Sequence, residues 1–486
     1  MMQENTRKLF WEKAENQLSE YGIWYVLAIV LLVRLWFVFD WREVWWDSGV
    51  YVGMAKWLWS LGTSGLWEDF RPVLWPFVLG FFWKIGISPV IAARVLMFVL
   101  SLGCVWLVFK IGSSVFDVRT GLLTSVLFGF SQIFFLLGFH EYTEIPALFL
   151  VLFGFWLFLK EKMFLSGLFI GLAVLMRFPS GLFGITLLAV LCWERIWKKI
   201  VLLGCGFSAV FAPFMVFNYW LYGSPFHSLI AGQQVISKVL GCTVLHALPW
   251  YAYFQLLLFE NVVNVFAVVG IALACFSSIQ NKRGKILVVL SSLIPLLYYS
   301  FLPCRDYRYL LSFLPFVVLL AVFGFSWFVR KKWLWYALSV LLIIFAVFNA
   351  ITFYKGEYIA YDVVAEQYNT FFHNVSASGE VWISNPVMAA YTDVPLHKVY
   401  YPVYDSAVAL SFNKYLQQNI DRVEYVALDN CGGGIICASD DVQCSAELSQ
   451  TLSFLSENYA PVLNTTKGRC WYLVFTNQND FISING

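Results

Sequence analysis

Charged residues are scarce in this chain. Only 13% of its 486 residues are Asp, Glu, Lys or Arg, and 60% are hydrophobic, whereas soluble proteins carry about 25% charged residues. A soluble fold could not cover its surface with so few polar groups. The formal net charge is only +2, so the charge balance gives no reason to expect a nucleic-acid partner. The composition therefore indicates an integral membrane protein.

The first twenty residues lack the apolar core of a cleavable signal peptide. They are polar and include seven charged residues, among them Arg7, Lys8, Glu12, Lys13, Glu15 and Glu20. We expect this segment to be a cytoplasmic lead-in to the first membrane span.

Apolar stretches long enough to cross a bilayer, which takes about 20 residues as a helix, recur along the chain. We predict eleven spans: 22–39, 89–109, 120–139, 145–160, 163–180, 181–193, 200–222, 251–279, 286–302, 309–329 and 333–353. The stretch 72–88 is also apolar, but Pro72, Pro76 and Gly86 interrupt it. It predicts a juxtamembrane helix rather than a twelfth span.

Basic residues gather in every second short loop, as the positive-inside rule requires of cytoplasmic loops. They are Lys110, Arg119, Lys160, Lys162, Arg195, Lys198, Lys199, Lys282, Arg283, Lys285, Arg330, Lys331 and Lys332. A twelfth span would place these clusters outside, so the rule favours eleven. The prediction is a multi-pass protein of the cell membrane with a cytoplasmic N-terminus and an extracytoplasmic C-terminal domain.

The last part of the chain has a different composition. Residues 354–486 alternate polar and apolar residues in strand-like runs at 381–385, 425–429 and 471–475. They predict a small extracytoplasmic α/β domain, following a helical transmembrane module, residues 1–353, whose first outer loop covers 40–88.

Four cysteines of this domain form an even set in an oxidising compartment, which favours disulfides of undetermined connectivity. They are Cys431, Cys437, Cys444 and Cys470. Their spacing fits no common zinc site. Asn374-Val-Ser and Asn464-Thr-Thr match the glycosylation sequon.

Topology explains the inner charges but not the outer ones, which are costly near a membrane. In the first outer loop, Asp47 lies among Trp45, Trp46 and Tyr51. Such a carboxylate can act as a general base toward a hydroxyl group, or hold a metal ion. The alternative is a solvated Asp in an interfacial aromatic belt. Asp69 and Arg71 follow in the same loop, where a salt-bridged helix start, together with Glu68, would also account for them.

Three polar residues, His140, Glu141 and Glu144, follow the third predicted span. Glu144 before Pro146 also suits a helix N-terminus, where a carboxylate stabilises the dipole. That reading explains Glu141 less well.

Arginines occur at the outer ends of two later spans. Arg177 is alone in its apolar helix, where snorkelling to the interface is the alternative to binding a lipid phosphate. Arg305 and Arg308 flank Asp306, which leaves open a local ion pair or a bound anion. Carboxylates from early loops and arginines from later helix ends thus converge on one face. That set suits glycosyl transfer from a lipid-phosphate sugar, because cations stabilise the departing phosphate.

The order of several short motifs resembles that of the GT-C superfamily of membrane glycosyltransferases over about residues 20–330. The chain is most similar to the dolichyl-phosphate-mannose protein mannosyltransferases and the lipid A aminoarabinose transferases. The motifs are DSGVYVGMA at 47–55, Arg71-Pro72, Ala92-Ala93-Arg94, GLFIGLAVLMRFPSG at 167–181, and Arg308-Tyr309 before Pro315. An Asp-Glu doublet is missing from the first loop, so the chain does not resemble a close protein O-mannosyltransferase, and the resemblance leaves the acceptor open.

The resemblance implies an all-α bundle and a donor that is a polyprenyl- or dolichyl-phosphate sugar. The acceptor is a lipid, a glycan or a protein. It implies Asp47 as the catalytic carboxylate, and we add Glu141. Four arginines are assigned to the donor phosphate: Arg71, Arg177, Arg305 and Arg308. Four residues are assigned to positioning the acceptor or donor: Tyr51, Asp69, His140 and Glu144. No cofactor is predicted.

The leading hypothesis is an inverting glycosyltransferase, with mannose as one candidate sugar. A transporter or flippase of a lipid-linked substrate is the alternative. It should show repeated halves or broken helices with polar residues at mid-membrane, and neither is visible in the sequence. A ligand-binding receptor would leave the converging charges unexplained.

Overall fold

The computed structural model describes residues 21–38, 44–234, 248–276, 281–302, 305–358, 379–399, 422–430, 442–467 and 470–477, with a few isolated positions between them. Everything below concerns these residues.

Helices dominate up to residue 358. The first is Tyr21–Phe37. The others are α2 (Trp46–Ser60), α3 (Leu74–Lys84), α4 (Pro89–Val115), α5 (Val118–Gly129), α6 (Gln132–Leu137), α7 (Glu144–Leu159), α8 (Met163–Met176), α9 (Gly181–Glu194), α10 (Trp197–Tyr222), α11 (His227–Gln234), α12 (Ala252–Glu260), α13 (Ala267–Phe276), α14 (Lys282–Phe301), α15 (Leu310–Phe328) and α16 (Lys332–Tyr358), with short 3-10 turns between some of them.

Each of the eleven predicted spans overlaps one of eleven apolar helices of the described chain. Five are long and apolar enough to cross a membrane by themselves, and six are shorter. The predicted juxtamembrane segment forms α3, whose 11 residues rise only about 16 Å, roughly half the thickness of a bilayer core. The predicted fold class, an all-α membrane bundle with a small α/β domain, is confirmed.

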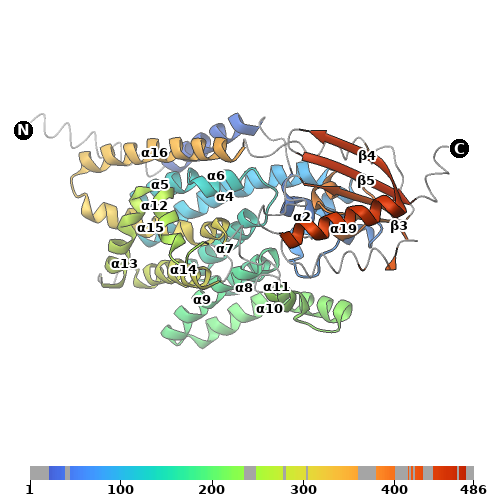
Figure 1. The fold of residues 1–486 in the computed structure, drawn as a ribbon. Coiled ribbons are helices and arrows are strands. Elements are labelled where there is room, and N and C mark those ends of the chain that lie inside the picture. The colour runs from blue at the N-terminus through green and yellow to red at the C-terminus, as the bar shows by residue number, and fades with distance from the viewer. Residues whose placement is uncertain are drawn as a thin grey trace, which may run out of the picture.

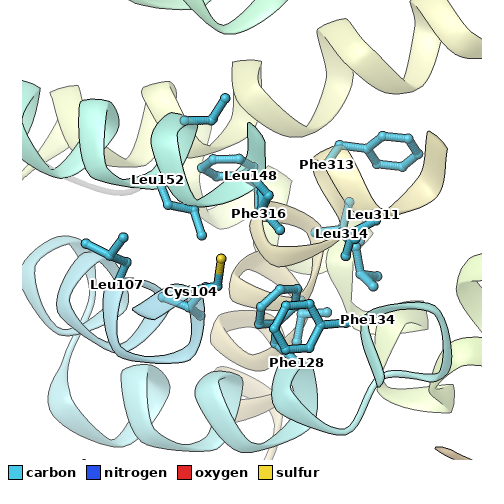
Figure 2. Packing of buried hydrophobic residues seen from close by; sticks show 14 of the residues in the cluster. Cys104, Leu107, Phe128, Phe134, Leu148, Leu152, Leu311, Phe313, Leu314 and Phe316 are labelled. Carbon is cyan, nitrogen blue, oxygen red and sulfur yellow. The ribbon is translucent and has the colours of Figure 1, made fainter. Parts of the chain in front are cut away.

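The bundle is built around α15. Its apolar window is 78% buried, whereas those of α10 and α16 are only 17% buried and form the periphery (Figure 1). Figure 2 shows side chains of α4, α5, α6, α7 and α15 meeting in one apolar core, with Cys104 of α4 among them. Sequence segments more than 200 residues apart therefore pack directly together.

Two predicted spans are interrupted, which corrects the expectation of unbroken helices. The interval 120–139 divides into α5 and α6, and 251–279 divides into α12 and α13 with the 3-10 turn Val262–Phe266 between them. The two interruptions meet at buried Glu260, whose carboxylate accepts hydrogen bonds from the backbone N–H groups of Gln132 (2.7 Å) and Ile133 (3.0 Å). Glu260 thus satisfies donors that the start of α6 would otherwise leave unpaired.

The C-terminal part contains a five-stranded sheet in the order β2-β1-β3-β5-β4. The strands are β1 (Glu380–Ile383), β2 (Leu396–Val399), β3 (Val423–Asp429), β4 (Tyr459–Lys467) and β5 (Cys470–Asn477). Strands β1, β2 and β3 are parallel, whereas β5 runs antiparallel to both β3 and β4. The three predicted runs lie in β1, β3 and β5. The sequence did not predict β2 or β4, and Pro461 in β4 is tolerated because β4 is an edge strand.

Both faces of this sheet are covered by helices. Alternate residues point to opposite faces, as strand geometry requires: Trp382 and Val426 pack toward α19 (Val442–Asn458), whereas Val381 and Ile383 pack toward α2. The first outer loop thus supplies one layer of the C-terminal domain, and Figure 1 shows α2 and α19 beside the strands.

Small residues of α2 allow this close approach. A Cβ atom at Gly49 would lie 2.6 Å from the backbone of Val387, and one at Gly53 would lie 2.9 Å from the side chain of Ala389. Backbone hydrogen bonds from Gly65 to Val394 (3.1 Å) and from Leu396 to Gly65 (2.8 Å) extend the contact. The glycines of the DSGVYVGMA motif therefore have a packing role beside any catalytic one.

Part of the cysteine and sequon predictions lies outside the described residues: Cys431, Cys437, the side chain of Cys444, and Asn374. Cys470 is disulfide-bonded, in agreement with an oxidising compartment. Asn464 lies within β4.

Candidate active site

A network of ion pairs occupies the end of the helical bundle that adjoins the C-terminal domain. Its members come from α2, the loop after α2, the start of α7, the end of α8 and the turn before α15. Asp47 is in the first turn of α2, where a carboxylate favours the helix dipole.

Asp47 is held between two arginines. One carboxylate oxygen lies 2.9 Å from Nη2 of Arg71, and the other lies 2.7 Å from Nη1 of Arg308, 261 residues away in sequence. Burial alone would raise the pKa of Asp47, but the two guanidinium groups outweigh it and hold the pKa well below its usual range. Asp47 is therefore ionised at any physiological pH.

Arg308 is the centre of the network. Besides Asp47, its guanidinium contacts Asp306 (2.7 Å) and Glu144 (3.7 Å). Glu144 in turn lies 2.6 Å from Nη1 of Arg177. The contacts of 2.7, 3.7 and 2.6 Å thus place the carboxylate of Asp47 no more than 9 Å from the guanidinium of Arg177.

Each of the three arginines also lies over a tyrosine ring. Arg71 is 5.2 Å from the ring centre of Tyr51, Arg177 is 5.4 Å from that of Tyr309, and Arg308 is 5.0 Å from that of Tyr142. Cation–π contacts of this length stabilise a guanidinium in a fixed position. The predicted positioning residue Tyr51 therefore orients Arg71, and its hydroxyl lies 3.4 Å from Thr143.

A small cavity opens beside the network. Its volume is about 20 Å³, and Glu144, Arg177 and Arg308 line it together with Tyr299, Tyr309 and apolar residues of α7. That is space for about one water molecule. Glu144 contacts both guanidinium groups beside this cavity, at 2.6 Å from Arg177 and 3.7 Å from Arg308.

The structure pairs Glu141 with a residue outside this network. Its buried carboxylate lies 2.6 Å from Nε of Arg94 in α4, and its backbone carbonyl accepts a hydrogen bond from the Trp75 indole (3.0 Å). Neighbouring His140 stacks on Trp45 at 3.6 Å between ring centres. Burial, followed by the charges of Arg94 and Arg308, lowers the pKa of His140 to about 3. Its ring is therefore neutral at physiological pH.

Two further predicted residues have partners elsewhere. Arg305 donates to the backbone carbonyls of Ser300 (2.9 Å) and Leu248 (2.5 Å), so it fixes a turn. Asp69 lies 2.6 Å from Nε2 of His227 and joins the outer loop to the start of α11. The predicted residues that the described contacts bring together are Asp47, Tyr51, Arg71, Glu144, Arg177 and Arg308.

Residues of the site that were not assigned to it from the sequence include Glu68, Tyr142, Asp306 and Tyr309. Glu68 pairs with Arg71 at 2.5 Å, as the salt-bridge alternative for this loop predicted. Asp306 pairs with Arg308, as the local alternative there predicted, yet Arg308 also reaches Asp47. The local ion pair with Asp306 is therefore compatible with a wider role of Arg308 in the site. No sequence signal marked Tyr142 as a platform for Arg308.

Comparisons with known proteins identify the fold. Residues 70–220 match the family described as dolichyl-phosphate-mannose-protein mannosyltransferase. ArnT from Cupriavidus metallidurans, solved bound to undecaprenyl phosphate, superposes with a TM-score of 0.64 at 11% identity over 94% of this chain and 98% of that one. The fold is that of a GT-C glycosyltransferase.

Two other GT-C structures extend the comparison. The archaeal oligosaccharyltransferase AglB from Archaeoglobus fulgidus, in complex with an inhibitory peptide and a dolichol-phosphate, has a TM-score of 0.61 at 11% identity, covering 95% of this chain and 75% of that one. The arabinofuranosyltransferase AftD from Mycobacteria has a TM-score of 0.55 at 10% identity, covering 93% and 40%. No curated protein sequence matches the chain. The resemblance to GT-C enzymes predicted from the sequence is confirmed.

Proposed function

We propose that this GT-C protein is an inverting glycosyltransferase that uses a polyprenyl- or dolichyl-phosphate sugar as donor. The observation that carries the proposal is the continuous contact from Asp47 through Arg308 and Glu144 to Arg177, beside a cavity. It puts a carboxylate able to accept a proton within 9 Å of a guanidinium able to hold a phosphate. ArnT and AglB were solved with lipid phosphates, which supports the choice of donor.

In the proposed reaction, a hydroxyl or similar nucleophile of the acceptor attacks the anomeric carbon of the sugar. The bond between that carbon and the phosphate oxygen breaks, and its electron pair leaves with the polyprenyl phosphate. Asp47 takes the proton of the acceptor. Arg177 and Arg308 stabilise the charge that develops on the phosphate. These residues supply the positive charge from the protein itself, so the proposal needs no cofactor.

Before a donor binds, Asp47 is a poor base. A carboxylate paired with two guanidinium groups is fully ionised but a weak base, because its pKa is low. When a donor phosphate engages Arg308, the hold of Arg308 on Asp47 weakens and the pKa of Asp47 rises. Donor binding would thereby activate the base only when there is a sugar to transfer.

We infer the finer points from the family match and the charge pattern. The match at residues 70–220 to dolichyl-phosphate-mannose-protein mannosyltransferases supports mannose as the first sugar to test. The predicted orientation puts the acceptor, whether a lipid, a glycan or a protein, at the extracytoplasmic face of the cell membrane. Neither Glu141 nor Arg305 is needed in this reaction scheme, although both stay candidates for catalytic and donor-phosphate roles.

Transport of a lipid-linked substrate remains the second candidate. The broken helices at Glu260 are of the kind that transporters use. Here, however, backbone donors of Gln132 and Ile133 engage the carboxylate. The break is thus internally satisfied, which favours a structural role and a transferase.

Replacing Asp47 with Asn tests the proposal directly. We expect transfer from a polyprenyl-phosphate mannose in membranes to fall about 10²- to 10⁴-fold, the usual contribution of a general base. Asp393→Asn is the matched control, since Asp393 is an exposed carboxylate at the same end of the protein and pairs with Lys56 at 3.0 Å. Unchanged turnover in Asp47→Asn would remove Asp47 from the mechanism, and uptake of labelled lipid without transfer would favour the transporter.

A further inference from the structure

A second and much larger cavity lies at the opposite end of the bundle from Asp47. Its volume is about 810 Å³, within the range of small-molecule sites of about 300–1,000 Å³. The first helix, α5, the end of α15 and the start of α16 form its walls. In Figure 1, α5 and the start of α16 lie at this end of the bundle, away from the strands.

The cavity has two chemically distinct parts. Cationic side chains lie at the helix ends: Arg119 in the first turn of α5, Arg330 after α15, and Lys332 at the first residue of α16. Apolar residues line the part nearer the membrane interior: Ile29, Leu122, Val126, Val340 and Ile343. A cationic rim above an apolar trough matches a ligand with an anionic head and a hydrocarbon body.

Among the described residues that line the cavity, Asp117 carries a carboxylate. Asp117 accepts hydrogen bonds from the backbone N–H and the hydroxyl of Thr120, both at 2.9 Å, and so caps α5. Its charge is directed at the helix dipole.

A buried hydroxyl lies between the two parts. Ser339 lines the cavity, its side chain is 5% exposed, and its hydroxyl has no hydrogen-bond partner within the described chain. Ser339 is seven residues beyond Lys332 on α16, so it lies roughly 10 Å deeper along the helix. By contrast, Ser326 in the same lining accepts a hydrogen bond from the Trp335 indole (3.1 Å). An unpaired buried hydroxyl is costly, and an ester carbonyl of a bound lipid would satisfy it.

We propose that this cavity holds one anionic glycerophospholipid of the membrane leaflet at that end. The phosphate would lie among Arg119, Arg330 and Lys332, a glycerol ester would accept from Ser339, and an acyl chain would fill the trough. Basic pockets between helices bind anionic head groups in this way. By the positive-inside rule that leaflet is cytoplasmic. The site is independent of the transfer reaction and of its lipid donor.

Native mass spectrometry of the full-length protein in detergent micelles tests the proposal. Phosphatidylglycerol and phosphatidylcholine with identical acyl chains are titrated in parallel. We expect one phosphatidylglycerol to bind at least about tenfold more tightly than phosphatidylcholine. Equal affinity for the two lipids would overturn the proposal. So would retention of free inorganic phosphate equal to that of phosphatidylglycerol.

Variants locate the site. The triple change Arg119→Gln, Arg330→Gln and Lys332→Gln should weaken phosphatidylglycerol binding at least about tenfold and leave phosphatidylcholine unaffected. The matched control Arg195→Gln with Lys198→Gln removes two exposed cations at the same end but outside the cavity, and should bind normally. Equal loss in the control would refute the site. Val340→Trp keeps every charge and fills the trough, so it tests the site even if the triple variant misfolds. Undiminished phosphatidylglycerol binding by Val340→Trp would also refute the site.

Discussion

Arg308 is the central cation of the candidate active site, because three carboxylates share its one guanidinium. The guanidinium lies 5.0 Å from the ring centre of Tyr142, and Asp306 accepts hydrogen bonds from both the backbone N–H and the side chain of Arg308. The side chain is therefore pre-positioned before any donor arrives. Residues held in this way stabilise a transition state without first having to be ordered.

Replacing Arg308 with Gln should have two measurable effects. Transfer should fall roughly 10²- to 10³-fold, because a cation facing the leaving phosphate is lost. The acid limb of kcat/KM should also move to higher pH. Arg308 helps to depress the pKa of Asp47, so its removal raises that pKa, and Asp47 becomes protonated at a higher pH.

The comparison variant is Arg305→Gln, since Arg305 donates to backbone carbonyls. It should leave the acid limb where it is. The pH profiles of kcat/KM are measured for both variants. An unchanged acid limb in Arg308→Gln would show that Arg308 does not lower the pKa of Asp47 during turnover.

Individual site residues were only partly predictable from the sequence. Asp47 and Arg308 could be proposed because charge near a membrane demands a reason, and the structure joins them across 261 positions. The partner of Glu141 could not be foreseen, since nothing in Ala92-Ala93-Arg94 says which carboxylate Arg94 will meet. Pairings of this kind depend on how distant helices pack together, and no local sequence pattern reveals that packing.

At the scale of elements, hydropathy found the helices because apolar length alone decides what can cross a bilayer. It could not find the interruptions at Phe130 and Asn261, since both stretches stay apolar on either side. The break in 120–139 is stabilised by Glu260, 128 positions from Gln132. A local hydropathy pattern cannot reveal such a long-range contact. Strands β2 and β4 were missed for a similar reason, as each is an edge strand whose partner supplies its register.

The contact of α2 with the C-terminal sheet predicts a specific effect of Gly49→Ala. The new methyl group would meet the Val387 backbone at 2.6 Å, and overpacking of this kind costs about 1–3 kcal/mol. We expect a lower melting temperature and faster proteolysis of the C-terminal domain in detergent. Gly204→Ala is the control, because a Cβ atom there meets nothing within 4 Å. Equal stability of the two variants would mean that α2 and the sheet are not in close contact.

At the scale of the whole molecule, the two ends of the bundle differ in kind. One end holds the ion-pair network beneath the sheet domain, and the other collects the basic loops and the large cavity. The positive-inside rule predicts that the basic end is cytoplasmic.

Cysteine labelling of intact cells tests this orientation. Ser456→Cys in α19 and Lys198→Cys at the basic end introduce exposed thiols at opposite ends. A membrane-impermeant maleimide should label Ser456→Cys in intact cells and Lys198→Cys only after lysis, relative to the parent protein. The reverse pattern would invert the predicted topology and place the reaction in the cytoplasm.

The contact between α2 and the sheet also affects the order in which the protein folds during synthesis. Val50 and Met54 of α2 belong to the same apolar cluster as Val381 and Ile383, which are made roughly 330 residues later, or about 15–70 s at ordinary translation rates of 5–20 residues per second. During that interval, the helix that carries Asp47 is already synthesised but lacks the sheet it packs against. Asp47 would then reach its final position only when the C-terminal sheet folds, so a chain that ends early would be inserted in the membrane but unable to carry out the proposed reaction.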